Sequence, residues 1–227
     1  EGSGKVYNVK IKKNAVESVS PVNWKKDNKE EPWAIKSYAV SNDKEYFIFS
    51  QYPTSDRSNP LELHKINGEL INTKSTPDLL EQVYPIGGHD YFCVDQRANI
   101  SFIKIDSGKI SSIKPVYENQ KELTAVNYDE QKNIGIISTK GRQIQVFNVS
   151  NTGSVDIILE TKLSQIRSEI SFIEIIPSNN WFAVGDRNGE IYFFDLKDGT
   201  YLFKTSSEHE NIITSLAVSP SGDLLAS

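Results

Sequence analysis

Few side chains in this sequence could do acid–base or metal chemistry. The three histidines, His64, His89 and His209, lack the short spacings typical of metal ligands. The single cysteine, Cys93, lies in an apolar run over residues 91–94, which predicts a buried thiol rather than a nucleophile. A site assembled from distant parts of the chain would leave no such spacing, and nothing in the sequence indicates one. We therefore predict no catalytic residue, no metal and no cofactor.

Arginine side chains recur at intervals and could bind carboxylates. A guanidinium group pairs with a carboxylate through two parallel hydrogen bonds. Four arginines each fall in a turn expected between two strands of a repeating unit: Arg57, Arg97, Arg142 and Arg187. They predict a rim that binds acidic peptides or carboxylate-bearing helices of other proteins. The alternative is a solvated surface, because exposed turns are often charged.

The loop over residues 24–33 is the other candidate for contact with a partner. Its charges alternate, which predicts a solvated excursion, and a tryptophan stands at each end of it. Trp24 either anchors the loop or faces a partner, and tryptophan is enriched at interface hot spots. Trp24 is therefore a predicted partner-binding residue, with burial as the alternative.

An internal repeat shows which elements would position these residues. Residues 172–184 align with residues 215–227, and Pro177 and Pro220 occupy equivalent places 43 residues apart. Within one unit, short apolar runs alternate with tight turns such as Asn188-Gly189, a strong hairpin signal. A unit of this length, built of short strands, is typical of a β-propeller blade.

The same pattern extends upstream, and it predicts an all-β fold: a β-propeller of four-stranded antiparallel blades. The first apolar residue of each third strand marks the repeat at Val6, Leu61, Ile100, Ile144 and Ile191. The prediction is a single propeller domain over 1–227, or a fragment of one, with half blades at 1–19 and 212–227 and blades at 33–74, 81–118, 122–164 and 170–205. The two halves either close a five-bladed ring or belong to a seven-bladed propeller, which we favour.

One turn of helix is expected in a connection over residues 76–82. Thr76 suits a helix N-cap, and Pro77 suits the first helical position.

Composition limits the class of partner and the compartment. The 227 residues carry 30 acidic and 25 basic side chains, a net charge of −5, which argues against general affinity for nucleic-acid backbones. One cysteine fits a reducing compartment, so we predict the cytoplasm or nucleus. No apolar run is long enough to span a membrane, and no membrane partner is expected.

The C-terminal repeats resemble those of WD-repeat propellers. Asp186 matches the family's turn aspartate, Phe194-Asp195 matches its Trp-Asp pair, and His209 matches the histidine of its Gly-His pair. Glu208 replaces the glycine, and no blade has the full His-Ser-Asp-Trp set, so the repeats are degenerate. In that family the histidine and aspartate tie loops together, which implies architectural roles here.

The resemblance implies a non-catalytic protein–protein interaction scaffold that displays loops on a rigid propeller within a multiprotein complex. Two alternatives stay open. Residues 194–203 are similar to the blade phrase of pyrroloquinoline quinone dehydrogenases, which indicates a propeller enzyme of the quinoprotein-dehydrogenase or lactonase type. An RNA-binding propeller that uses the arginine rim is the second alternative.

Overall fold

The protein is built from β-strands. The structure, a computed structural model, describes residues 7–12, 15–21, 35–52, 58–150, 152–205 and 209–227, with side chains from residue 35 onward. None of these residues is helical, which confirms the all-β prediction. Among them no helix is long and apolar enough to cross a membrane.

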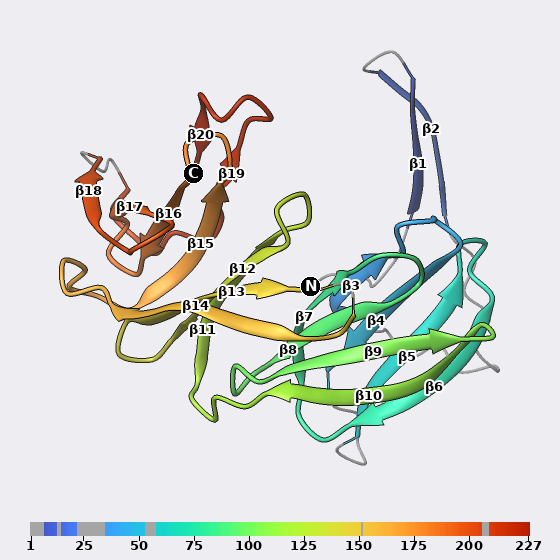
Figure 1. Cartoon of the computed structure of the whole chain (residues 1–227). Helices are drawn as coiled ribbons and strands as arrows, with labels where there is room; N and C mark the ends of the chain where they lie inside the picture. Colours follow the sequence, from blue (N-terminus) through green and yellow to red (C-terminus); the bar gives the residue numbers. More distant parts are fainter. Residues whose placement is uncertain (1–6, 13–14, 22–34, 53–57, 151, 206–208) are drawn as a thin grey trace. The chain divides into compact units, whose positions relative to one another are not determined.

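The chain divides into two compact units. The first comprises Glu1–Asp95 with Ser101–Lys114, and the second comprises Gln96–Ile100 with Pro115–Ser227. Each unit contains four-stranded antiparallel sheets in which consecutive strands are neighbours, as predicted (Figure 1). Four such sheets are described, together with two strand pairs.

The first unit holds the pair β1–β2 and two four-stranded sheets. The first residue of β9 and the last three residues of β10 are assigned to the second unit. The pair is β1 (Tyr7–Lys12) and β2 (Ala15–Pro21). The first sheet is β3 (Ile35–Val40), β4 (Tyr46–Gln51), β5 (Asn59–Lys65) and β6 (Leu70–Thr76). The next is β7 (Leu80–Pro85), β8 (Tyr91–Asp95), β9 (Ile100–Asp106) and β10 (Lys109–Tyr117).

The second unit repeats this arrangement with two more sheets and a final pair. Its first sheet is β11 (Leu123–Asp129), β12 (Ile134–Thr139), β13 (Gln143–Val149) and β14 (Val155–Lys162). Its second sheet is β15 (Ile170–Ile176), β16 (Trp181–Asp186), β17 (Ile191–Asp195) and β18 (Tyr201–Lys204). The final pair is β19 (Ala217–Val218) and β20 (Leu225–Ala226).

The prediction of a helical turn over residues 76–82 is wrong, because β6 and β7 occupy most of that segment. The hydroxyl of Thr76 donates to the carbonyl oxygens of Asn59 (3.2 Å) and Asp78 (2.9 Å) instead of accepting from a helical amide. Pairing of β6 with β5 and of β7 with β8 supplies more hydrogen bonds than one isolated helical turn could. Tertiary pairing therefore overrides the local capping signal.

The central strands of each sheet are buried on both faces. In β4, β12 and β16, every residue after the first is buried, which explains their near-continuous apolar sequences. The core of the first unit joins Ile48 and Leu61 of one sheet to Tyr91 and Cys93 of the next. Sheets thus stack face against face, and Cys93 is buried as predicted.

In the second unit the same stacking joins both sheets and the final strand pair. Ile136 and Val146 of the first sheet pack with Phe182 and Phe194 of the second. On the opposite face of the second sheet, Phe193 packs in a cluster with residues of the segment that leads to β19. One sheet therefore contributes apolar side chains to two successive cores.

The first strand of each sheet lies at an edge, where its amides need partners outside the sheet. β3 contacts β7, and in the second unit β11 contacts β15, which contacts β19. The Val83 amide donates to the Ser37 hydroxyl at 3.0 Å, and the Ile175 amide donates to Asn127 Oδ1 at 3.2 Å. Polar side chains thus link neighbouring sheets along this edge.

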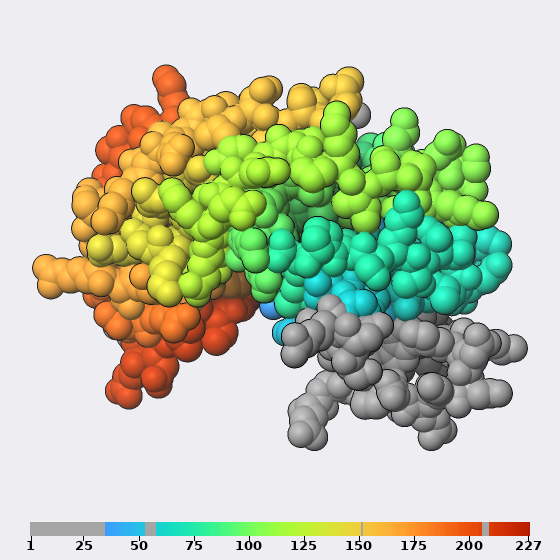
Figure 2. Space-filling view, turned by 90° about the horizontal axis from the view of Figure 1, so that it is seen from below, coloured from blue at the N-terminus to red at the C-terminus, as the bar shows by residue number. Residues whose placement is uncertain are grey.

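The fourth strands form the outer edge. Burial alternates residue by residue along β14, and Ile158 is 47% exposed. Figure 2 shows this part of the second unit, in golden orange, at the surface of the view. A half-buried outer strand is consistent with its alternating apolar and charged residues.

Candidate functional site

The structure describes three of the five residues predicted to bind partners. Trp24 and Arg57 lie outside the described residues. Arg97, Arg142 and Arg187 belong to the second unit, and each lies in a turn between the second and third strands of a sheet, as expected. The chain segments that connect one sheet to the next contact these arginine-containing turns.

Backbone hydrogen bonds tie these turns to the connections. The Arg187 amide donates to the carbonyl of Glu169 at 3.0 Å, and the Leu163 amide donates to the carbonyl of Arg142 at 3.0 Å. The Lys140 amide donates to the carbonyl of Glu122 at 2.9 Å. The arginine turns are therefore held rigidly.

The arginine side chains differ in their surroundings. The Arg142 guanidinium donates to the carbonyl of Ile166, a contact within the protein. Arg97 is exposed and approaches Gln120 at 3.5 Å, and Arg187 is also exposed. Arg142 thus stabilises a connection, while binding by the arginine rim stays a prediction.

A groove at the other end of the second unit is the stronger candidate. It has a volume of about 690 Å³ and lies along β11, β15 and β19 and the turns that follow them. Pro177 and Pro220, equivalent in the sequence repeat, both line it. Three carboxylates do so as well, namely Asp129, Glu130 and Glu174, and we call this site the acidic groove.

Close packing of two turns shapes one wall of the acidic groove. A Cβ atom added to Gly222 would lie 1.7 Å from the hydroxyl oxygen of Ser178, and Gly222 has a φ of +79°. A side chain at this position would collide with the neighbouring turn as well as strain the backbone. Glycine is therefore required for the approach of the two turns.

Glu174 is the most enclosed of the three carboxylates. Burial raises its pKa, although hydrogen bonds from the Val218 backbone and the Asn127 side chain work in the opposite direction. The Asn127 amide nitrogen lies 2.9 Å from Glu174 Oε2. The carboxylate thus joins the edge strands of three successive sheets.

The turn after β11 adds further negative charge. Burial, and then the charge of Asp129, raise the pKa of Glu130. Burial, with Glu130 and Asp129 beside it, raises the pKa of Tyr128 to about 12. The Lys132 ammonium donates to the carbonyl of Pro177 on the groove wall. The arrangement favours a cation that supplies hydrogen-bond donors to the carboxylates.

The raised pKa of Glu174 predicts a pH-dependent stability difference. Its ionisation opposes folding above the raised pKa, whereas the protonated group carries no such penalty below its ordinary value of 4.5. Glu174→Gln should therefore raise the melting temperature at pH 7, and the difference from wild type should close at pH 4. Thermal unfolding followed by circular dichroism at both pH values measures this.

The matched control is Glu160→Gln, which neutralises an exposed glutamate on β14 of the same unit. It should leave the melting temperature nearly unchanged at both pH values. A Glu174→Gln protein less stable than wild type at pH 7 would show that ionised Glu174 is net stabilising, contrary to this account.

The acidic groove was missed in the sequence. Asp129, Glu130 and Glu174 are separated by up to 45 residues, and acidic side chains are frequent throughout the chain. The repeat did offer one signal, because it placed the turns at Pro177 and Pro220 in register. The polar residues on the edge strands at the same position, Asn127 and Glu174, could have been found from that register.

Comparison with known proteins shows a shared fold. No family model matches the sequence, and no curated protein does. Among solved structures 1364 chains match, so the architecture is widespread. One is the computationally designed Ika8 protein, with a TM-score of 0.60 and 16% identity over 83% of this chain and 54% of the designed chain. The present chain thus spans about half of that protein, and the likeness concerns the fold alone.

Proposed function

We propose that this chain is a large part of a degenerate WD-repeat β-propeller and acts as a non-catalytic interaction scaffold in the cytoplasm or nucleus. Stacked four-stranded sheets, with contacts between successive first strands in each unit, support the propeller. The 43-residue spacing of Pro177 and Pro220 supports a repeat of blade length. A rigid framework of this kind holds a binding surface in place at little entropic cost.

The acidic groove is the observation that carries the proposed function. It is concave, and its carboxylates come from the edge strands and turns of adjacent sheets rather than from one mobile loop. Asn127 and the Val218 backbone fix Glu174 in place, so the site is organised before a partner binds.

The chemistry of the acidic groove favours a lysine- or arginine-containing segment of a partner protein. Three carboxylates attract cationic side chains, and the lining turns add hydrogen-bonding groups of Ser178 and Ser219. In the arginine rim, which would attract an acidic segment, the Arg142 side chain is already engaged by the carbonyl of Ile166. The acidic groove is therefore the preferred partner site.

A hexalysine peptide tests this proposal. Substituting Asp129→Asn together with Glu130→Gln removes two carboxylates from the acidic groove without removing side-chain volume. In about 0.1 M salt the dissociation constant for hexalysine should rise about tenfold, because each ion pair to a carboxylate of the acidic groove contributes roughly 0.5–1 kcal/mol. Fluorescence anisotropy with a labelled peptide measures it.

The control carries the same loss of charge elsewhere in the unit. Asp156→Asn with Glu160→Gln neutralises two exposed carboxylates of β14. This variant should bind hexalysine with an affinity within about twofold of wild type, because distant exposed charges are screened by salt. Equal weakening in both variants would mean that hexalysine responds to net charge and not to the acidic groove.

A further inference from the structure

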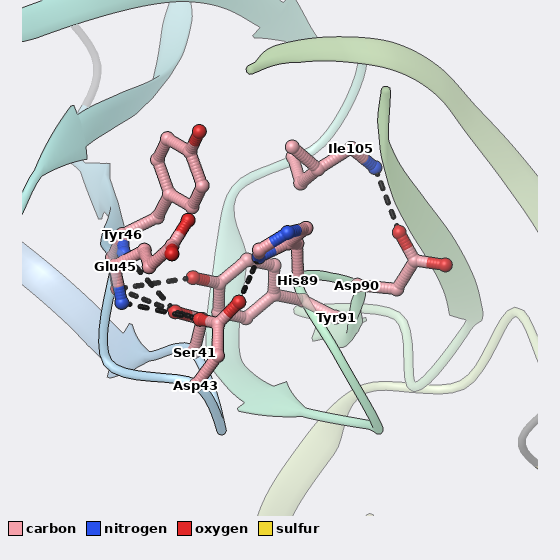
Figure 3. Close-up of polar contacts among 8 residues, drawn as sticks. All are labelled: Ser41, Asp43, Glu45, Tyr46, His89, Asp90, Tyr91 and Ile105. Carbon is pink, nitrogen blue, oxygen red and sulfur yellow. Dashed lines mark hydrogen bonds and ion pairs between the residues drawn. The ribbon is translucent and has the colours of Figure 1, made fainter. Parts of the chain in front are cut away.

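Two turns of the first unit bring together three side chains that could hold a metal ion. Asp43 and Glu45 lie in the turn between β3 and β4, and His89 lies in the turn between β7 and β8. Each offers one ligand atom, and these atoms lie within 4.8 Å of one another. Figure 3 shows the His89 imidazole and the Asp43 carboxylate pointing toward each other. This cluster is separate from the acidic groove, which belongs to the second unit.

The surrounding residues fix both ligand-bearing turns. The hydroxyl of Ser41 donates to Asp43 Oδ1 at 2.5 Å, and the Glu45 amide donates to the same oxygen at 3.1 Å. Asp43 Oδ2 is thereby turned toward His89. The Tyr46 ring meets the imidazole edge-on at 5.1 Å between centroids. Asp90 Oδ1 accepts from the Ile105 amide at 2.8 Å, which holds the second turn.

The environment of His89 Nδ1 points to a ligand. This atom is buried, although the side chain as a whole is 41% exposed. It lies within ion-pair range of Asp43 Oδ2, but the contact does not have hydrogen-bond geometry, and no described group gives Nδ1 a hydrogen bond. A buried ring nitrogen between carboxylates needs either a proton donated to a carboxylate or a cation that all three groups share.

We propose that Asp43, Glu45 and His89 bind a divalent transition-metal ion such as Zn²⁺. One imidazole nitrogen and two carboxylates match the ligand preferences of Zn²⁺, whereas Ca²⁺ and Mg²⁺ prefer oxygen ligands alone.

The metal would join adjacent sheets and keep open coordination positions. The two turns belong to successive sheets, so one ion bound to both links them directly. A pocket of about 340 Å³ opens beside Glu45 and Tyr46, on the side of the turn between β5 and β6. A water molecule from this pocket, which Glu45 lines, would complete the coordination shell of a site with three protein ligands.

Isothermal titration of the metal-free chain with Zn²⁺ tests the proposal. Wild type should bind one equivalent at this site with a micromolar or lower dissociation constant. His89→Ala and Glu45→Gln should each weaken that binding at least tenfold. The His89 ring signals in NMR spectra should shift on addition of Zn²⁺ and not on addition of Ca²⁺.

The matched control is His209→Ala, which removes an imidazole of the second unit that pairs with Ser227 at 2.7 Å. It should retain the wild-type affinity for Zn²⁺ at the proposed site. Absence of Zn²⁺ binding by wild type would overturn the proposal and leave a simple ion pair between His89 and Asp43. The same conclusion would follow if His89→Ala bound Zn²⁺ like wild type, or if Ca²⁺ bound there and Zn²⁺ did not.

Discussion

Phe194→Ala is expected to lower the free energy of unfolding of the second unit by about 3–5 kcal/mol, the range for removing a buried phenylalanine. The Phe194 side chain is fully buried and stacks on Phe182 with 5.3 Å between ring centroids. It also belongs to the core that joins its sheet to Ile136 and Val146 of the preceding one. The substitution therefore leaves a cavity where two sheets meet.

Urea denaturation followed by far-ultraviolet circular dichroism measures this loss. Phe203→Ala is the matched control, because Phe203 is 42% exposed on the outer strand β18 of the same sheet. It should lose about 1 kcal/mol, since much of that ring already contacts water. If both variants lost the same free energy of unfolding, the face of the sheet that packs on the preceding sheet would contribute no more to stability than its outer strand does.

Asp186→Ala should lower the free energy of unfolding by about 2–3 kcal/mol, because two partly buried amides lose their acceptor. The Asp186 side chain is fully buried, and its Oδ1 accepts from the amides of Asn188 and Glu190, each at 2.9 Å. Its carbonyl oxygen accepts from the Ile213 amide at 3.1 Å, at the connection that leads to β19. The residue thus holds a tight turn against the next segment of chain.

Asp186→Asn separates the two properties of this aspartate. The amide oxygen can still accept from both turn amides, and the buried Oδ2, which has no described hydrogen-bond partner, no longer carries charge. Asp186→Asn should therefore be clearly more stable than Asp186→Ala in the same urea experiment. Asp198→Ala, in an exposed turn where Asp198 Oδ1 accepts from the Thr200 amide at 2.8 Å, should lower the free energy of unfolding less than Asp186→Ala does. If Asn were as destabilising as Ala at position 186, the charge and not the hydrogen bonds would be the stabilising feature.

The strands and turns were readable in the sequence because they follow from local rules. The unbroken apolar runs of β4 and β12 indicated strands buried on both faces, and the structure confirms this. The Asn188-Gly189 signal marked a real turn, in which Gly189 has a φ of +83°. Its close approach to the carbonyl of His209 explains why glycine stands there.

The segment over residues 76–82 shows where local rules fail. Thr76 and Pro77 have the types expected at the start of a helix, yet long-range pairing with β5 and β8 determines the backbone there. A single turn of helix has little stability of its own, so the ladder of the sheet prevails.

The candidate sites were not found in the sequence, because stacking brings together residues that are far apart along the chain. Asp43 and His89 meet only through adjacent turns of two sheets, although they are 46 residues apart. Asn127 and Glu174 meet in the same way, through contact of β11 with β15. Arg142 shows the converse, since its place in a turn was predicted but its contact with Ile166 was not.

Mapping of hexalysine binding by NMR tests the proposed scaffold most directly. Backbone amide signals of the ¹⁵N-labelled chain are followed as the peptide is added at low salt. The account predicts that the largest shifts fall in the acidic groove, over residues 127–132, 174–178 and 218–222. Shifts concentrated at Arg97, Arg142 and Arg187, or no saturable shifts in the acidic groove, would contradict it.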